Sequence, residues 1–372
     1  MNKKIKKYGV ILIILAVIYL YFGFEKDFLP IEELDIPSGV GIDLVLDELG
    51  NIEYSVPISF YNYGEEEKIS SLTHTGYGST IPETRETRQL ISSKKMILGI
   101  ERVLMFSEDA SRAGIKSYLE IFFKNPNIND TALVSICKGK CEDILNYKVP
   151  EYPSAADYIA GILEHSTEFN FFSHKYILSD VFICIASEGK NIALPYIEVK
   201  DDKLQITGMA LFKEDKMVKK LDMDQVKVMN ILRENNVKGM LTLQSNLKEY
   251  IGYFAKTKRK VKCEKKDETY TFFIDLSFNG DIIDNSLFDG IHKDEDTMKK
   301  FEKNMKEHVE KICNDFITDM QQNLKFDCLR LGHVAAAKYG RHTGVDWNEI
   351  VCKSTIKVNV KIKVDKMGRG DY

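Results

Sequence analysis

The sequence is poor in the residues that mark fibrous, disordered or low-complexity chains. Its 372 residues include only eight prolines, and no Pro/Ser-rich linker or internal repeat interrupts them. Hydrophobic residues make up 44% of the chain and charged residues 29%, as in ordinary globular proteins. We therefore expect a chain that is folded throughout and is long enough for two or three domains.

The cysteines are too few and too scattered to form a disulfide framework. They are Cys137, Cys141, Cys184, Cys263, Cys313, Cys328 and Cys352. Because their number is odd, at least one thiol is free or paired outside the chain. Cys137 and Cys141 form the one close pair, and zinc sites usually need a second pair or histidines at fixed spacing. We predict no metal site.

Motifs of catalysis and of nucleotide binding are also missing. The chain has no HExxH, no G-x-S-x-G, no Walker A and no G-x-G-x-x-G. GYGST (Gly76–Thr80) is interpreted as a turn rather than an anion loop. Asp43, Asp47 and Glu48 are interpreted as a strand end and a solvated turn rather than paired carboxylates. A Ser/His/Asp set assembled in space stays open, but we predict no catalytic residue, no cofactor and no enzyme activity.

The chain also has no net positive charge. The formal net charge is −4, and it is more negative once the N-terminal lysines are set aside. KTKRKVK (Lys256–Lys262) is the one basic run, and acidic residues follow it at once, so we interpret it as a solvated hairpin or loop. This balance disfavours nucleic acid and anionic lipid as general partners.

One long apolar run is present, from Tyr8 to Phe24, and it contains no charged residue. As a helix it would be about 25 Å long, at roughly 1.5 Å per residue, and it falls within the range of about 17–25 residues for a membrane span. Four lysines precede it, at positions 3, 4, 6 and 7. They predict that residues 1–7 stay in the cytoplasm and that everything after residue 24 lies on the outer side.

Three other interpretations of this run are weaker. A cleaved signal peptide needs small residues after the apolar region, whereas the chain continues with YLYFGFEKDF. A lipoprotein signal needs a cysteine there, and the first cysteine is Cys137. The lysine cluster at the very N-terminus disfavours a buried helix of a soluble domain. We therefore predict an uncleaved single-pass anchor over 8–24.

Two regions are predicted after the anchor, and the first spans residues 30–200, possibly as two modules. Its expected elements are a β-hairpin over 39–60, loops over 64–68 and 74–79, a helix over 81–95, a strand over 97–106, a helix over 107–124, a strand over 131–137, a helix over 138–145, and strands over 176–186 and 193–199. The order strand, helix, strand indicates a βαβ-like unit.

The second region spans 204–372. Strands are expected over 204–222, 237–243 and 270–279, and a short helix over 224–234. Apolar residues recur every three or four positions from 296 to 324, which predicts the longest helix, with its stripe facing a sheet rather than a partner helix. From 352 to 364 apolar residues alternate with lysines, which predicts a half-buried strand with one lysine-rich face. The predicted class is α+β, with mixed and antiparallel sheets and packed helices behind one transmembrane helix.

Four stretches in order along the chain resemble the Ger(x)C family, the C subunits of spore germinant receptors. They are GVGIDLVLDELGNIEYSV from Gly39, ILGIERVLMFSEDASRAGI through KGKCEDIL from Ile97, ITGMALFKEDKMVKKLD from Ile206, and KFDCLRLGHVAAAKYG through STIKVNVKIKV from Lys325. Most members of the family are lipoproteins with a cysteine directly after the signal region. This chain has none there, so the anchoring role passes to residues 8–24.

The resemblance implies a non-enzymatic C subunit of a nutrient germinant receptor. Such a subunit works with an A and a B subunit in triggering spore germination, on the outer side of the spore inner membrane. The sequence names no germinant and no residue that contacts one, so contact with a small-molecule germinant is either indirect or unknown. The exposed candidates for contact surfaces are the lysine face of the last strand and the loops around Gly76. An anchored solute-binding protein and an anchored cell-wall hydrolase are the alternative functions.

Overall fold

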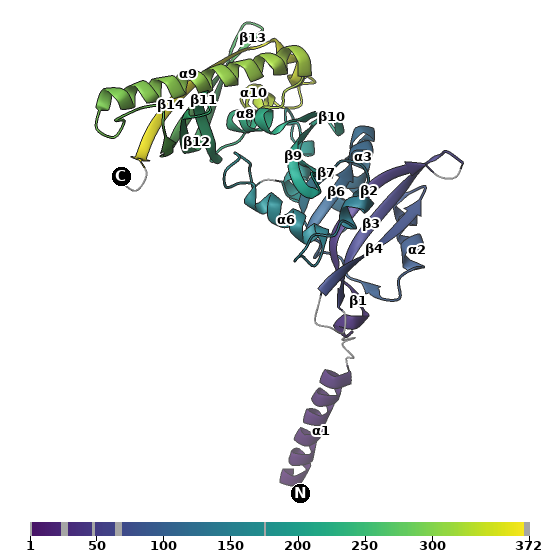
Figure 1. Ribbon diagram of the computed structural model, residues 1–372. Helices are drawn as coiled ribbons and strands as arrows, with labels where there is room; N and C mark the ends of the chain where they lie inside the picture. The colour runs from purple at the N-terminus through teal and green to yellow at the C-terminus, as the bar shows by residue number, and fades with distance from the viewer. Residues whose placement is uncertain (1, 24–28, 47–48, 64–68, 175, 368–372) are drawn as a thin grey trace.

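The computed structural model describes residues 2–23, 29–46, 49–63, 69–174 and 176–367. Figure 1 shows two packed bodies in tandem and a helix, α1 (Asn2–Gly23), that stands apart from them. Within the described ranges, no helix combines the length and the apolar content that a membrane crossing requires. This result does not support the predicted span over 8–24.

The first body is built on an eight-stranded sheet of order β10-β9-β8-β7-β6-β2-β3-β4. The four central strands β2, β6, β7 and β8 are parallel, and an antiparallel pair extends the sheet at each side. The strands are β2 (Pro37–Leu46), β3 (Ile52–Tyr63), β4 (Ile69–Gly78), β6 (Val103–Ser107), β7 (Leu133–Cys137), β8 (Ala193–Lys200), β9 (Lys203–Lys213) and β10 (Lys216–Leu221). The predicted hairpin over 39–60 is confirmed as β2 and β3.

Helices cover both faces of this sheet, as the near-continuous apolar strands β6 and β7 require. One face packs against α3 (Glu108–Ala113), α4 (Lys116–Lys124) and α7 (Leu178–Ala186). The other packs against α5 (Cys141–Leu145) and α6 (Ala155–His165). The short strands β1 (Leu34–Asp35) and β5 (Lys95–Met96) pair separately, after the 3₁₀ turn Ile31–Glu33.

The edge strand β4 is covered by α2 (Ile81–Gln89), the helix predicted over 81–95. The Tyr77 N–H donates to Thr87 Oγ1 at 2.9 Å. A Cβ on Gly76 would lie 1.8 Å from the Thr84 carbonyl oxygen, so the glycine permits close packing of helix on strand. The loop predicted over 74–79 is therefore wrong, and Gly76 is buried rather than exposed.

Three other predictions for the first body need correction. The helix over 107–124 is interrupted at Gly114, whose φ of 125° ends α3 before α4 begins. The strand over 97–106 begins only at Val103. The strand over 176–186 is wrong, because this segment is the helix α7 with Leu178, Val181 and Cys184 on its buried face. The loop predicted over 64–68 lies outside the described residues.

The second body is a four-stranded sheet of order β11-β12-β13-β14 with helices packed on one face (Figure 1). β14 runs parallel to β13, and the other neighbours are antiparallel. The elements are α8 (Met223–Arg233), β11 (Lys238–Asn246), β12 (Glu249–Lys266), β13 (Thr269–Asn285), α9 (Glu295–Asp319), a π turn (Met320–Leu324), α10 (Leu331–Tyr339), α11 (Trp347–Lys353) and β14 (Thr355–Met367).

The predicted long helix over 296–324 is confirmed as α9 and the π turn that continues it. Its stripe of Phe301, Met305, Val309 and Cys313 is buried in the core that also contains the apolar side chains of β12 and β13. The interpretation as a core stripe is therefore confirmed. The basic run Lys256–Lys262 lies in strand β12, which forms a hairpin with β13, so of the two interpretations the hairpin is confirmed and the loop is wrong.

Candidate functional site

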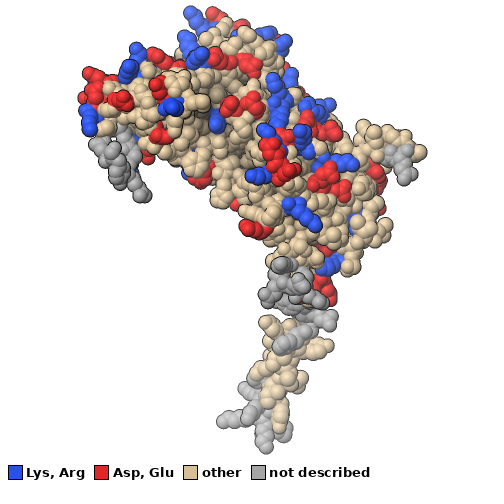
Figure 2. Space-filling model, viewed as in Figure 1, with Lys and Arg blue, Asp and Glu red and all other residues tan. Residues whose placement is uncertain are grey.

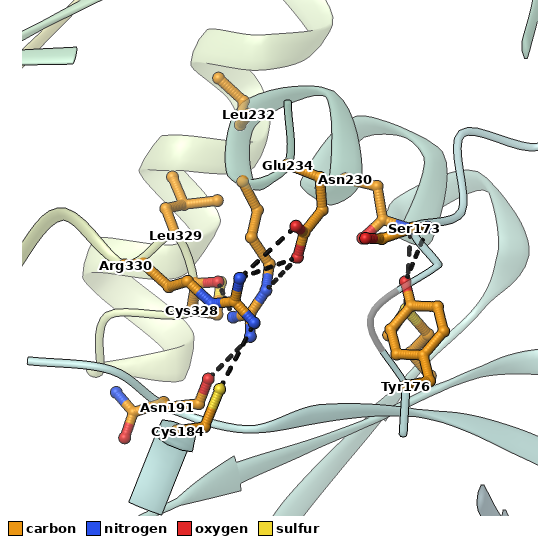
Figure 3. Close-up of polar contacts among 12 residues, drawn as sticks. Ser173, Tyr176, Cys184, Asn191, Asn230, Leu232, Glu234, Cys328, Leu329 and Arg330 are labelled. Carbon is orange, nitrogen blue, oxygen red and sulfur yellow. Dashed lines mark hydrogen bonds and ion pairs between the residues drawn. The ribbon is translucent and has the colours of Figure 1, made fainter. Parts of the chain in front are cut away.

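The two bodies meet at a junction that contains an unusual density of buried charge. The Arg233–Glu234 step ends α8, and the segment Cys328–Arg330 leads into α10. Cys184 and Asn191 approach from α7 and the loop before β8. Figure 3 shows Glu234, Arg330 and Cys184 close together between elements of both bodies.

Arg233 is the centre of this junction, with 3% of its surface exposed. It donates to the Cys328 carbonyl oxygen at 2.6 Å and to the Asn191 carbonyl oxygen at 2.8 Å. Its Nε lies 3.1 Å from Glu234 Oε1. Burial lowers the pKa of Arg233, and the neighbouring Arg330 acts in the same direction. The planar fork of a guanidinium can hold three acceptors at once, which a lysine ammonium would not reproduce.

Arg330 shares the same carboxylate from the opposite side. Its Nη1 lies 3.3 Å from Glu234 Oε1, and its Nη2 donates to Cys184 Sγ at 3.6 Å. Burial acts to lower the pKa of Arg330, but Glu234, Cys184 and other neighbouring groups together outweigh burial and raise it. The φ of Arg330 is 60°, a left-handed conformation that a non-glycine residue adopts rarely. The Glu234 carboxylate thus pairs with two guanidinium groups, that of the buried Arg233 and that of the partly buried Arg330.

A second buried carboxylate, Asp327, fixes the start of α10. It accepts the N–H of Leu329 at 2.9 Å and of Gly332 at 2.7 Å. Burial raises the pKa of Asp327, against these hydrogen bonds and the nearby guanidinium groups. Arg259 of β12 donates to the Leu329 carbonyl oxygen at 3.0 Å, and so ties the sheet of the second body to the same segment.

Hydrogen bonds of Arg233 and Arg330 reach Asn191 and Cys184 of the first body, so we interpret the junction as a rigid joint rather than a hinge. Loops and helix ends of both bodies contribute backbone carbonyls that only the buried arginines satisfy, and an unsatisfied buried carbonyl costs free energy. A change in the relative position of the bodies would break several of these bonds together. The junction is therefore suited to transmit force or position between the bodies.

A cleft of about 670 Å³ opens next to the junction. Its walls come from the end of α7 and the loop before β8, the β9–β10 turn, and the segment that leads into α11. Its lining residues are Lys116, Ile185, Ser187, Gly189, Lys190, Asn191, Lys213, Glu214, Asp215, Gly344, Val345, Asp346, Trp347 and Asn348. Charged groups of both signs face it, and no histidine is among the residues that line it.

The acidic residues and the cysteine pair that the sequence analysis considered as possible sites have structural roles where the structure describes them. Asp43 is buried in β2, not in a solvated turn, and accepts the Cys141 N–H at 2.7 Å at the start of α5. Asp47 and Glu48 lie outside the described residues. The Sγ atoms of Cys137 and Cys141 are 3.2 Å apart and buried. In the described ranges no group of three His, Cys, Asp or Glu residues is arranged to hold a metal ion.

Sequence reasoning missed the junction altogether. Arg233, Glu234 and Arg330 stand in apolar surroundings, NILREN and DCLRLG, and that context was the available signal. A charged residue inside an apolar stretch is rarely buried unless it is paired. Arg233 pairs with its neighbour Glu234, but Arg330 and the carbonyl acceptors of Arg233 lie far away in the sequence, so the network as a whole had no local signature.

Comparison with known proteins assigns the chain a family. The family model described as spore germination protein N-terminal domain matches residues 27–199, and that described as spore germination B3/GerAC like, C-terminal matches residues 207–368. Spore germination protein GerQC of Bacillus cereus is 23% identical over 349 residues, which cover 91% of this chain and 93% of that protein. The putative spore germination protein YfkR of Bacillus subtilis (strain 168) is 27% identical over 149 residues, 38% of each chain.

The solved structure of the GerBC protein has the same fold. It matches with a TM-score of 0.53 at 12% identity, and the match covers 88% of this chain and 97% of that one. The fold and the junction define an α+β protein of two rigidly joined bodies, and the homology gives it a role in spore germination. The chain belongs to the Ger(x)C family, as its sequence predicted.

Proposed function

We propose that the chain is the non-enzymatic C subunit of a nutrient germinant receptor and works with an A and a B subunit to trigger spore germination. The observation that carries this proposal is the similarity to spore germination protein GerQC over 91% of the chain. The rigid junction supports it, because a subunit that passes a signal between partners needs bodies that move together. Its role is to hold and position partners, and the germinant acts on it only indirectly.

The proposed location is the spore inner membrane, with residues 8–24 as a single-pass anchor and the two bodies on the outer side. The support comes from the side chains of α1. Its large apolar side chains at Tyr8 and, among the described ones, from Ile11 to Tyr21 are exposed, with Leu12 at 68% and Leu15 at 57%. Figure 2 shows this helix as a stalk without charged side chains among the residues drawn in colour. An apolar helix with no protein to cover it is stable in a lipid environment.

We further propose residues 30–200 and 204–372 as the two domains of the outer part. The gap between the residues matched by the two family models falls between 199 and 207. Strand β9 begins within this gap and β10 lies after it, and both complete the sheet of the first body. Because β9 pairs with β8, these two strands would link the second domain to the first.

The cleft beside the junction supports one alternative, an anchored solute-binding protein. Its lining offers lysines and carboxylates to a small zwitterionic solute, and such sites are usually concave with a few convergent polar groups. Titration calorimetry with amino acids would show binding under this alternative. The receptor-subunit proposal expects none. No comparable observation favours a cell-wall hydrolase.

Deleting the gene should block germination in response to one class of nutrient and leave vegetative growth intact. The reason is that a receptor lacking one subunit fails for its own germinants, while other receptors still work. The measurement is the fall in optical density of purified spores after addition of single nutrients, with a strain carrying the restored gene as the control. Normal germination with every nutrient, in a strain without a second copy of the family, would contradict the proposal.

A further inference from the structure

The face of the four-stranded sheet that points away from α9 carries a dense array of lysines. In strands β12 and β14 alternate residues point to the same face, and the apolar set is buried under α9. The other set is exposed and forms what we call the lysine face: Lys256, Lys258, Lys260 and Lys262 of β12, with Lys357, Lys361 and Lys363 of β14. The sequence predicted the β14 part as a lysine-rich face, and the fold adds the basic run of β12 to it.

Strand pairing arranges these lysines as two columns. β13 lies between β12 and β14, and its register places lysines opposite each other across it. The opposing pairs are Lys256 with Lys363, Lys258 with Lys361, and Lys262 with Lys357. The columns are about 10 Å apart, which is two strand spacings. Lysines two residues apart along a strand are about 7 Å apart, and Asn359 stands between Lys357 and Lys361, which are about 13 Å apart.

Little within the described chain neutralises this charge. Asp275 is the one carboxylate in the central strand between the columns, and it accepts the Asn359 amide at 3.1 Å. Lys363 pairs with Asp365 at 3.0 Å, and Lys357 lies 5.6 Å from the centre of the Phe273 ring. The protein as a whole carries a formal charge of −4. The visible opposite side of this body instead mixes both signs of charge (Figure 2).

A shallow groove runs between the columns. Its volume is about 290 Å³, and it is lined by Lys258, Lys260, Lys361, Asp275, Leu276, Ser277 and Asn359. The floor is the backbone and short polar side chains of β13, and lysines form both walls. A groove of this width admits a single extended chain laid along β13.

We propose that the lysine face binds an extended acidic segment of a partner protein. In an extended chain, alternate side chains point the same way at a spacing of about 7 Å, which matches the spacing of the lysines along the β12 column. Carboxylates at every second position would then reach a lysine of either wall. Charge complementarity of this kind sets specificity and speeds association.

The chemistry of the face favours a carboxylate-bearing partner over two other polyanions. Arginine, which binds phosphate through a bidentate fork, is absent from the lysine face. Binding to an anionic lipid surface usually adds apolar side chains that insert into the bilayer. None of the exposed large apolar residues belongs to these rows of the sheet. The proposal goes beyond the proposed function and does not depend on it.

The test uses the full chain, purified in detergent, and a fluorescent synthetic peptide with glutamate at every second position and threonine between. A variant with Lys258→Glu and Lys361→Glu should bind this peptide at least about tenfold more weakly, because it reverses one opposing pair and repels the carboxylates. The matched control, Lys300→Glu with Lys303→Glu, makes the same change of net charge on the exposed side of α9 and should bind like the natural chain.

Two further arms keep the test decisive. A Lys258→Gln and Lys361→Gln variant, with an unchanged circular dichroism spectrum, should also lose affinity, which excludes misfolding as the cause. Equal binding by all variants would overturn the proposal. Tighter binding to inorganic polyphosphate or to vesicles containing phosphatidylglycerol than to the peptide, lost in the Lys258/Lys361 variants, would overturn it in favour of those ligands.

Discussion

Replacing Glu234 by alanine should lower the free energy of unfolding by about 3–5 kcal/mol, the cost of breaking a buried ion pair by removing one partner. Glu234 Oε1 lies 3.1 Å from Arg233 Nε and 3.3 Å from Arg330 Nη1. Without it, two guanidinium groups remain in a dry junction with backbone carbonyls and a thiol as their acceptors. Urea denaturation of the purified chain, followed by tryptophan fluorescence at Trp347, measures the loss.

Two further variants distinguish the stability effect of the buried network from the effect of removing a surface charge. Glu168 pairs with Lys238 at 2.6 Å on the exposed surface, so Glu168→Ala should leave the unfolding midpoint unchanged. Glu234→Leu combined with Arg330→Met removes one charge of each sign and should recover part of the loss, because an unpaired buried charge is the costly state. A Glu234→Ala variant as stable as the natural chain would show that the junction is wet and mobile.

Removing residues 1–27 should release the protein from membranes completely. The large apolar side chains of α1 are exposed, and nothing in the described part of the chain covers them. Sedimentation of lysed spores after an alkaline carbonate wash measures the distribution between pellet and supernatant. We expect the full chain in the pellet and the truncated chain in the supernatant.

The control for this truncation replaces residues 8–24 by leucines and keeps the flanking lysines. It should remain in the pellet, because membrane partition depends on apolar surface and length rather than on particular contacts. Mass spectrometry of the natural chain should find residues 8–24 retained. A mature N-terminus near Glu25, or a truncated chain that stays in the carbonate-washed pellet, would contradict the anchor.

Long periodic elements were predictable from the sequence, because their pattern repeats often enough to identify one period. The stripe of α9 repeats over seven helical turns, and β14 alternates over a dozen residues. Both elements were confirmed. The segment 176–186 failed for the opposite reason. It is short and rich in β-branched and aromatic residues, so strand propensity dominated, while Leu178, Val181 and Cys184 show the helical spacing only once the sheet beside them is known.

The roles of single glycines and of charged residues were harder to predict, because these roles depend on contacts with residues distant in the sequence. Gly76 permits a helix to approach a strand, yet locally it resembles a turn residue. The basic run of β12 resembled a solvated loop until strand pairing set it beside the lysines of β14. The junction combines three segments more than forty residues apart, so no short window of sequence held Arg233 together with its carbonyl acceptors at Cys328 and Asn191.

Co-purification from spore membranes tests the central claim most directly. An epitope-tagged chain, solubilised in mild detergent and captured from dormant spores, should bring down the polytopic A and B subunits of a single germinant receptor in comparable amounts. A tagged, unrelated single-pass protein of the same membrane serves as the control. Capture of the intact chain without any receptor subunit, under conditions that preserve other membrane complexes, would contradict its assignment as a receptor C subunit.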